Sequence, residues 1–350
     1  MNEKKTSFAS DYEEGAHHTI ISNLNRTNLL KTAGFGLDEF SEAARKKIRD
    51  ACKNSDADIF FMVGGTQANF VVISALLKSY EGVIAAESGH INFREAGAIE
   101  ATGHKILTLP HVDGKILAGD VKIFVENFYA GELHEHMIAP GMVYISQPTE
   151  YGTLYTLEEL RKLSTVCREK NLKLYVDGAR LAYALAYPRN NVTLKHLCEL
   201  ADVFCIGGTK CGAFFGEAVV MRKNFIPHFT TVIRQHGALL AKGRILGVQF
   251  YTLFTDDLYM KIGRRAIDTA DKIRDEIKKQ GFELYVDSPT NLIFVTLTET
   301  QARKLSEHIE FRTWEKLPPE KVVIRLVTSW ATKDNEVEVL LNELRRLKFV

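Results

Sequence analysis

The 350-residue chain lacks the features that mark membrane proteins, secreted proteins and nucleic-acid-binding proteins. It contains no apolar run of about 18 residues or more, which excludes an ordinary transmembrane helix. Its first residues, Met1–Ser7, lack the hydrophobic core of a signal peptide. Lys plus Arg number 45 and Asp plus Glu 44, and this balance argues against binding to nucleic acid or to an anionic membrane. No repeat or low-complexity segment is evident.

Cysteine is scarce and has no pattern. There are five cysteines, an odd number, and none belongs to a Cys-x-x-Cys pair. This spacing suits neither a disulfide framework nor a zinc site, so we expect reduced thiols, no metal and a cytoplasmic protein. The content of 45% hydrophobic and 25% charged residues is that of an ordinary globular protein, long enough for one large and one smaller domain.

Short apolar runs alternate with amphipathic helical segments through the first two thirds of the chain. The expected strands are Val83–Ala86, Lys105–Leu109, Met142–Ser146, Leu172–Val176, Val203–Ile206 and Ala218–Met221. The segment Thr156–Lys170 has helical spacing and opens with the Thr-x-x-Glu pattern of a capping box. Strands that alternate with helices predict an α/β fold with a mostly parallel sheet covered on both faces.

The last third of the chain has a different pattern. A helical stretch over about Ile262–Gln280 leads to strand-like runs at Phe282–Val286, Leu292–Thr296 and Val322–Thr328. These runs predict a smaller α+β C-terminal domain. We therefore expect three parts: a polar, turn-rich N-terminal arm (residues 1–20), a large domain (21–245) and a small domain (246–350).

Two charged motifs follow predicted strands. Asp177 comes directly after Leu174–Val176, and Lys210 follows Val203–Ile206 within the sequence Gly-Gly-Thr-Lys. Buried parallel strands present functional groups at their carboxyl ends. A lysine and a carboxylate presented together suit pyridoxal 5'-phosphate, because the lysine can bind its aldehyde and the carboxylate can keep its ring nitrogen protonated. Taken singly, Asp177 could instead cap a helix, and Lys210 could be a surface lysine.

A third motif predicts an anion site. The apolar run Phe60–Val63 is followed by Gly64, Gly65 and Thr66 and then by a helical run at Phe70–Leu77. Glycines let an anion approach the backbone, and the N–H groups and dipole of a helix N-terminus favour negative charge. The motif lacks the Gly-Lys-Ser/Thr of a Walker loop and the third glycine of a dinucleotide fingerprint. We expect it to bind the phosphate of the cofactor.

The order of these motifs resembles the threonine aldolase and β-eliminating lyase family of pyridoxal phosphate enzymes. The resemblance rests on Gly65-Thr66, Gly89-His90, Glu95-Ala96-Gly97, Asp177-Gly178-Ala179-Arg180 and Thr209-Lys210, and extends from Ser10-Asp11 to Arg325. It implies the aspartate aminotransferase fold (fold type I), with a mostly parallel sheet of the seven-stranded type. It also implies a homodimer or homotetramer whose active sites are shared between subunits.

The resemblance also implies roles for individual residues. His90 would stack on the cofactor ring, although taken singly it could be a capping or core histidine. Glu95 would orient His90 or organise the loop. The implied cofactor contacts are Gly64, Gly65, Thr66, His90, Asp177, Arg180, Thr209, Lys210 and, reaching the neighbouring subunit's site, Arg234. The implied contacts to the carboxylate of an amino-acid substrate are Ser10, Arg180 and Arg325.

One segment departs from the family. Where well-studied threonine aldolases often have Thr-His-Asn-Gly, this chain has Thr149, Glu150, Tyr151 and Gly152. Glu150 could act as a general base toward a hydroxyl group, bind a cationic or hydrogen-bonding side chain, or face solvent. The departure leaves it open whether threonine itself is the preferred substrate.

The expected activity is that of a carbon–carbon lyase of amino-acid metabolism. It would cleave a β-hydroxy-α-amino acid of the threonine or allo-threonine type to glycine and an aldehyde, with His90 or Glu150 taking the hydroxyl proton. In the alternative reaction, Lys210 removes the Cα proton and β-elimination yields pyruvate and ammonia. A third reading is a metabolite-binding protein with little catalysis, against which the complete set of Lys210, Asp177 and Arg325 argues.

Overall fold

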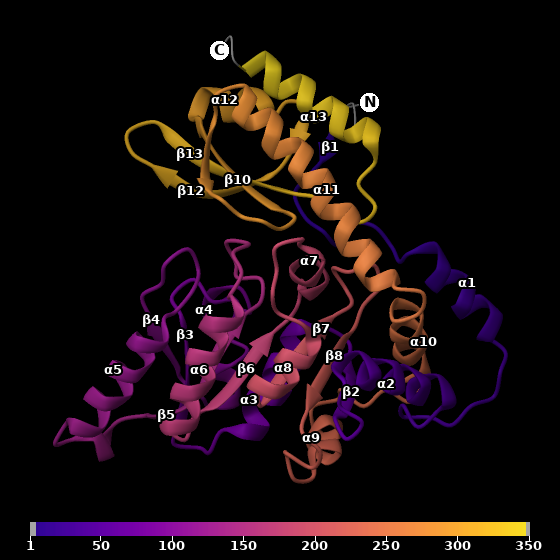
Figure 1. The fold of residues 1–350 in the computed structure, drawn as a ribbon, viewed down its shortest axis with the longest axis vertical. Helices are drawn as coiled ribbons and strands as arrows, with labels where there is room; N and C mark the ends of the chain where they lie inside the picture. Colours follow the sequence, from indigo (N-terminus) through magenta and orange to yellow (C-terminus); the bar gives the residue numbers. More distant parts are fainter. Residues whose placement is uncertain (1–4, 348–350) are drawn as a thin grey trace.

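The computed structural model describes residues 5–347, which form a large body and a smaller one (Figure 1). A seven-stranded sheet lies in the large body and a four-stranded sheet in the smaller one. The long helix α11 (Leu258–Lys279) runs from the large body along the smaller one (Figure 1). In the described part of the chain, no helix is both long and apolar enough to cross a membrane.

The seven-stranded sheet is mostly parallel, as predicted. In sheet order, its strands are β2 (Asp58–Met62), β8 (Glu217–Met221), β7 (Val203–Gly207), β6 (Lys173–Asp177), β5 (Ala139–Ser146), β3 (Glu81–Ala86) and β4 (Ile106–Leu109). Only β8 runs antiparallel to its neighbours, β2 and β7. Each predicted strand of the large domain overlaps one of these strands, so the predicted fold class is confirmed.

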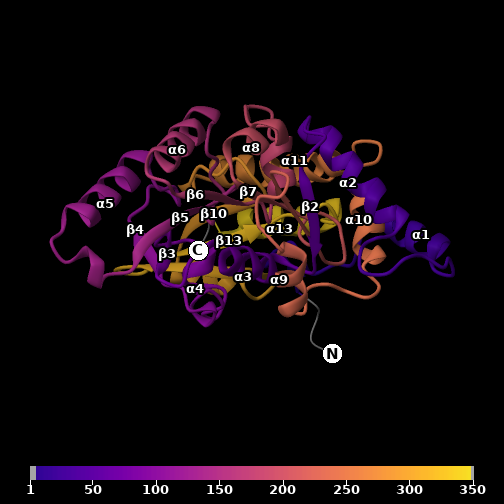
Figure 2. The ribbon, with the colours of Figure 1, turned by 90° about the horizontal axis from the view of Figure 1, so that it is seen from below.

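Helices cover both faces of this sheet (Figure 2). One face carries α1 (His18–Thr27), α2 (Glu39–Cys52), α5 (Ala118–Ala130), α6 (Leu157–Glu169), α7 (Leu181–Ala186), α8 (Leu194–Leu200) and α10 (Arg244–Leu253). The other face carries α3 (Gly65–Leu76), α4 (His90–Phe93) and α9 (Phe229–Gln235). Two short 3-10 helices, η1 (Glu100–Thr102) and η2 (His134–His136), lie in the loops around β4 and α5.

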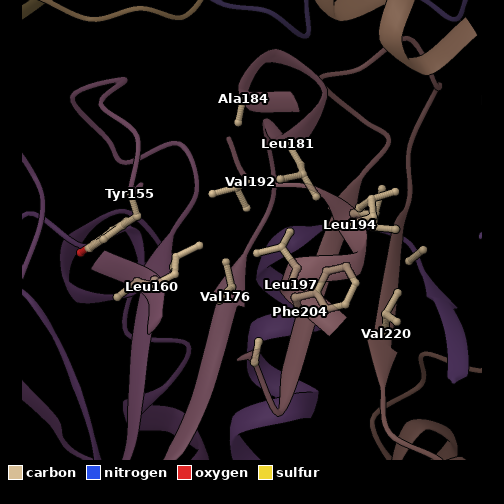
Figure 3. Close-up of a cluster of buried hydrophobic side chains, with 14 of the residues drawn as sticks. Tyr155, Leu160, Val176, Leu181, Ala184, Val192, Leu194, Leu197, Phe204 and Val220 are labelled. Atoms are coloured by element: carbon tan, nitrogen blue, oxygen red, sulfur yellow. The ribbon is translucent and has the colours of Figure 1, made fainter. Parts of the chain in front are cut away.

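The side chains of each strand alternate between the two faces of the sheet and contribute to a hydrophobic core on each face. In β6, Leu174 and Val176 belong to the core beneath α6 and α8, whereas Tyr175 belongs to the core beneath α3. Figure 3 shows part of the first core, where Val176 and Phe204 from adjacent strands lie beside the helical residue Leu197. Because successive side chains of a strand point to opposite faces, Asp177 lies on the α3 side together with Tyr175.

The capping box predicted for the segment from Thr156 forms at the start of α6. The Thr156 hydroxyl accepts a hydrogen bond from the Glu159 backbone N–H (3.2 Å), and the Glu159 carboxylate accepts one from the Thr156 N–H (2.7 Å). These bonds satisfy two donors that a helix N-terminus leaves free. Leu160 and Leu163 then anchor the helix to the core.

The four-stranded sheet is antiparallel throughout. In sheet order, its strands are β12 (Arg312–Leu317), β13 (Lys321–Val327), β10 (Leu292–Thr298) and β9 (Glu283–Val286). One face packs on α11, α12 (Glu299–Leu305) and α13 (Asp334–Leu347). The other face carries Phe294, Val323 and Val327. Since Arg325 lies between Val323 and Val327, alternation places it on this second face.

The N-terminal arm connects the two bodies. Its strand β1 (Thr6–Ser7) pairs with β11 (Ile309–Glu310), and Phe8 is buried in the core of the small body. The segment that follows the large domain also packs on the large sheet. Its core includes residues of α10 and of the first part of α11, through Ala266. The domain boundary placed at residue 245 stays a prediction.

Candidate active site

Two glycines let the ends of β6 and β7 approach each other closely. A Cβ atom on Gly178 would lie 1.9 Å from the Cys205 carbonyl oxygen, and one on Gly207 would lie 2.3 Å from the Ala179 carbonyl oxygen. The Gly207 N–H donates to the Gly178 carbonyl (2.9 Å). No side chain fits at either position, so the glycines are required where the chain turns toward Asp177 and Lys210.

Asp177 and Lys210 line one cavity of about 290 Å³ at the carboxyl ends of these strands. This is where open α/β sheets bind their ligands. The cavity also brings together most of the other predicted site residues: Gly64, Gly65, Thr66, His90, Glu150, Arg180 and Thr209. Ser10, Arg325 and Arg234 do not line it.

Asp177 is buried and held by three donors. Its Oδ2 atom accepts hydrogen bonds from the Tyr144 hydroxyl (2.5 Å) and the Asn69 amide (3.2 Å), and Oδ1 accepts one from the Ala179 N–H (2.8 Å). Burial, together with the charge of Asp177, raises the pKa of Tyr144 well above its ordinary value, so Tyr144 remains a donor. Asp177 does bond to the backbone of the turn, but α7 begins only at Leu181. It is therefore not the N-cap of that helix.

His90 forms a hydrogen bond with Glu95. The imidazole Nδ1 lies 2.7 Å from Glu95 Oε1, which also accepts a hydrogen bond from Asn69 (2.8 Å). Burial alone would lower the pKa of His90, but the hydrogen bond to Glu95 and the charges of Glu150 and Asp177 outweigh burial and raise it. The ring is thus fixed at the cavity wall with Nε2 as its remaining polar atom.

The N-terminus of α3 forms an open anion site on the same cavity. Gly64 is the N-cap and supplies no side-chain cap. A Cβ atom built on Gly64 or Gly65 would meet no heavy atom within 4 Å, so space is open beside this backbone. The first N–H groups of a helix need a partner, and a phosphate group supplies one that the dipole favours.

Lys210 completes a set that fits pyridoxal phosphate. Its Nζ atom makes no hydrogen bond or ion pair within residues 5–347. The cavity therefore offers an anion site at Gly64–Thr66, an anchored carboxylate at Asp177 and an unengaged amine. These are the three groups that the phosphate, the ring nitrogen and the aldehyde of the cofactor require.

Arg180 has its guanidinium engaged by a residue that was not predicted. Its Nε and Nη2 atoms donate to the two carboxylate oxygens of Asp11 (2.7 and 3.0 Å), and both side chains are buried. The Asn291 amide donates to the same carboxylate (3.0 Å). Arg180 therefore lines the cavity, and Asp11 of the N-terminal arm holds its guanidinium group. Its contacts to cofactor and substrate stay predictions.

Arg325 is buried and has no acidic partner among residues 5–347. It is 8% exposed, and its Nε atom has no hydrogen-bond partner in the part of the chain that the structure describes. Its guanidinium carbon lies 5.5 Å from the centre of the Trp314 ring. Burial, followed by the positive charge of Arg180, lowers the pKa of Arg325 to about 10. Arg325 therefore does not face solvent. An anionic ligand would pair with its buried charge and lower the cost of leaving that charge unpaired.

The other predicted residues take up different positions. Ser10 is buried, and its hydroxyl has no hydrogen-bond partner among the described residues. The Glu150 carboxylate is buried, with Oε2 3.8 Å from Arg94 Nε, so it does not face solvent. Arg234 lies exposed on α9, with its guanidinium carbon 4.8 Å from the centre of the Phe35 ring. The roles of these three residues stay predictions.

Sequence reasoning missed four polar residues of the site: Asp11, Asn69, Tyr144 and Glu217. Glu217 is 2% exposed and lines the cavity, and its Oε2 atom has no hydrogen-bond partner between residues 5 and 347. A signal for it existed, because a carboxylate directly before the apolar run Ala218–Met221 breaks the pattern of a buried strand. Asn69 and Tyr144 carry no comparable signal, since each lies within an otherwise ordinary helix or strand.

The fold and this cavity define a pyridoxal phosphate enzyme of fold type I. Residues 31–304 match the β-eliminating lyase family, and the chain belongs to this family. Pyridoxal phosphate, the cofactor predicted from the sequence, is the cofactor of this family. The chain is accordingly an enzyme of the lyase class.

Individual relatives agree with this assignment. The low specificity L-threonine aldolase of Pseudomonas sp. is 28% identical over 352 residues, covering 99% of each chain. The Leishmania major threonine aldolase structure superposes with a TM-score of 0.94 at 39% identity, covering 98% of this chain and 99% of that one. Aspartate aminotransferase from Thermus thermophilus has a TM-score of 0.72 at 16% identity, covering 98% and 91%, and supports the fold alone.

Proposed function

We propose that the protein is a threonine aldolase, a carbon–carbon lyase that cleaves threonine or a similar β-hydroxy-α-amino acid to glycine and an aldehyde. The observation that carries this proposal is the pairing of the unengaged Lys210 amine with the anchored Asp177 carboxylate in one cavity. The names of the similar proteins from Pseudomonas sp. and Leishmania major support the choice of substrate class.

Three groups on the cavity wall would hold the cofactor. Gly64, Gly65 and Thr66 would bind its phosphate, Lys210 its aldehyde carbon and Asp177 its ring nitrogen. When bound, the cofactor supplies an electron-accepting ring that stabilises negative charge left on Cα. Tyr144 and Asn69 keep the Asp177 carboxylate in place, where its charge would keep the ring nitrogen of a bound cofactor protonated.

The substrate carboxylate finds two polar groups without partners. The Arg325 Nε–H and the Ser10 hydroxyl are both buried and unsatisfied in the described part of the protein. Leaving such groups unpaired costs about 1–3 kcal/mol each, and a carboxylate that pairs with them removes this cost. Arg180, held rigidly by Asp11, supplies a further positive charge on the same side.

Cleavage requires a base for the β-hydroxyl proton. Glu150 and His90 both line the cavity. A hydrogen bond to Glu95 fixes the ring of His90, and the Glu150 carboxylate lies 3.8 Å from Arg94. Because the pKa of His90 is raised, it holds its proton to higher pH than an ordinary histidine and is a weaker candidate at neutral pH. We therefore assign Glu150 as the base that accepts the β-hydroxyl proton. Glu150 takes the place of the histidine that the family often has in this segment.

The family description favours β-elimination as a second candidate. In that reaction Lys210 would take the proton from Cα and a substituent would leave from Cβ, which yields pyruvate and ammonia from a suitable amino acid. Both reactions use the same cofactor site. They differ in whether the bond between Cα and Cβ or the bond between Cα and hydrogen is broken.

We further infer a homodimer or homotetramer with shared active sites. Large apolar side chains in the segment between α1 and α2 are exposed, with Leu29 92% and Leu37 78% accessible. Arg234 lies on the same surface beside Phe35, outside its own cavity, from where it could reach the cavity of a second subunit. A cytoplasmic location is in keeping with five free cysteines.

The proposed activity is tested by the products formed. Purified enzyme is incubated with L-threonine and L-allo-threonine, and with L-serine as a substrate for elimination, and glycine, acetaldehyde, pyruvate and ammonia are quantified. We expect glycine and acetaldehyde in equal amounts, and none from Lys210→Ala. Pyruvate and ammonia from serine, without glycine from either threonine isomer, would replace the proposal with the lyase reaction.

A further inference from the structure

Trp314 is an aromatic residue of the small body for which the proposed reaction has no role. It lies half-buried on β12, an edge strand of the four-stranded sheet. The pairing of β12 with β13 shifts register between Thr313 and Glu315, which makes Trp314 the extra residue of a β-bulge. Bulges are common at sheet edges and beside active sites, where they redirect a side chain. Here the Trp314 ring packs beside Phe294 (5.0 Å between ring centres), on the sheet face that carries Arg325.

Two guanidinium groups lie over the Trp314 ring, one from each body. The guanidinium carbon of Arg325, on β13, is 5.5 Å from the ring centre, and that of Arg94, at the end of α4, is 4.7 Å from it. Both distances are within the range of a cation–π contact, and tryptophan is the aromatic side chain that attracts cations most strongly. The indole ring therefore connects an arginine of the small body to an arginine of the large body.

Contacts with the large body fix this ring relative to the cavity. The Tyr151 ring meets the Trp314 ring edge to face, with the ring centres 5.3 Å apart. Tyr151 directly follows Glu150, which lines the cavity, and Arg94 Nε lies 3.8 Å from Glu150 Oε2. The position of Trp314 is thus set by the cavity wall as well as by its own sheet.

Arg325 depends on packing for its orientation. It belongs to the small body and does not line the cavity, and its buried Nε atom has no hydrogen-bond partner among residues 5–347. A guanidinium that stacks on an aromatic ring uses its planar face and leaves the N–H groups at its edge free. Contact with Trp314 can therefore orient Arg325 without occupying the donors that a carboxylate pairs with.

We propose that Trp314 is a positioning residue, which orients the Arg325 guanidinium so that its N–H groups meet the carboxylate of a bound amino acid. Trp314 acts on the amino acid through Arg325, and its contacts with Arg94 and Tyr151 hold the pair in place relative to the large body. The inference rests on the proposed function, in which Arg325 binds the substrate carboxylate. It does not depend on which bond of the substrate is broken.

Equilibrium binding of glycine to the full-length holoenzyme, followed by cofactor absorbance, tests this role. Glycine carries the carboxylate but no β-hydroxyl group, so binding is measured without cleavage. Trp314→Leu should raise the Kd for glycine about fivefold or more, because a cation–π contact contributes on this order. Trp314→Phe keeps an aromatic face and should recover most of the affinity. Trp330→Leu, which replaces the other tryptophan of the chain, should bind glycine like the parent enzyme.

A double variant shows whether Trp314 acts through Arg325. Once Arg325→Met has removed the guanidinium, adding Trp314→Leu should weaken glycine binding by no more than about twofold, since the effects of independent residues multiply and those of coupled residues do not. Full multiplication of the two effects would overturn the proposal. If Arg325→Met alone bound glycine like the parent enzyme, the carboxylate site of the proposed function would fail, and this inference with it.

Fluorinated tryptophan tests the contact in a protein that keeps the side chain. Because the chain has two tryptophans, a Trp330→Phe background lets fluorinated tryptophan label Trp314 alone. Fluorine atoms withdraw electron density from the ring face and weaken its attraction for a cation, but they change its shape little. The Kd for glycine should rise with the number of fluorine atoms. A Kd that stays constant along this series, or that keeps the parent value in Trp314→Leu, would overturn the proposal.

Discussion

Arg180 and Asp11 form a buried ion pair with two hydrogen bonds, which joins the end of β6 to the N-terminal arm. Asp11 also accepts a hydrogen bond from Asn291, in the loop before β10 of the small body. One carboxylate thereby connects the arm, the large sheet and the small sheet at the edge of the active site. The arm is a structural part of the site, and Arg180 depends on it for its position.

Replacing Asp11 should therefore destabilise the protein. Asp11→Asn leaves the Arg180 guanidinium buried without its counter-charge, and breaking such a pair costs on the order of 3–5 kcal/mol. Chemical denaturation at pH 7 should show this loss, whereas Glu13→Gln, at an exposed position in the same arm, should change little. Equal stability of Asp11→Asn and the parent protein would show that the pair contributes nothing.

The pH dependence of this loss follows from the pKa of Asp11. Burial raises the pKa, but Arg180, Lys210 and the hydrogen bonds from Arg180 and Asn291 outweigh burial and leave it below the ordinary 3.8. The contribution of Asp11 is thus complete above pH 3.8 and is lost as pH falls through the lower, folded-state pKa. The difference between parent and Asp11→Asn should stay constant from pH 7 to 5 and shrink only in stronger acid.

The charge of Asp177 should matter more for turnover than for cofactor affinity. Asp177→Asn keeps the shape of the side chain but cannot hold the ring nitrogen protonated, so kcat should fall by about 100-fold or more. Cofactor affinity, measured by equilibrium titration, should change far less, because the phosphate and Lys210 still bind. Tyr144→Phe removes one donor to the carboxylate and should cost much less activity. Near-full activity of Asp177→Asn would make Asp177 a turn-forming residue only.

Arg325 should act on substrate binding. Arg325→Lys keeps the charge but loses the planar fork that binds a carboxylate through two hydrogen bonds, so KM should rise about tenfold or more with a smaller change in kcat. Steady-state kinetics with threonine measures this split. Arg312, which lies opposite Arg325 in the register of β12 and β13 but is exposed, provides the matched control as Arg312→Lys. An unchanged KM would remove Arg325 from the substrate site.

Glu150 should act on the bond-breaking step. Glu150→Gln keeps the size of the side chain but cannot accept the β-hydroxyl proton, so cleavage should slow by about 100-fold or more. Binding of glycine, followed by the change in cofactor absorbance, should remain nearly unchanged. If cleavage persisted in Glu150→Gln and fell in His90→Asn instead, the histidine would be the base.

The sequence carried enough information to predict the large sheet and most of the residues that line the cavity. Its strands are buried runs ended by functional residues, and Asp177, Lys210 and Gly64–Thr66 stand at such ends, where the pattern changes abruptly. Their convergence could be predicted because parallel strands present their carboxyl ends at one edge of a sheet.

What could not be predicted depends on long-range contacts. The partner of Arg180 is Asp11, 169 residues earlier, and the amide that anchors Asp177 belongs to Asn69, 108 residues earlier. The spacing of residues within a short segment does not predict contacts between residues so far apart in the sequence. The orientation of Arg325 could not be decided either, because an arginine in an alternating strand fits both a solvent-facing and a buried face until the packing of Phe294, Val323 and Val327 is known.

The attachment of the cofactor to Lys210 is the claim on which the proposed function depends, and borohydride reduction tests it directly. The purified enzyme should absorb visible light, lose this band on reduction and retain the cofactor through denaturation. Peptide mapping by mass spectrometry should find the reduced adduct on Lys210, and Lys210→Ala should yield no stable adduct. An adduct on another lysine, or reduction that leaves the protein unmodified, would contradict the account of this site.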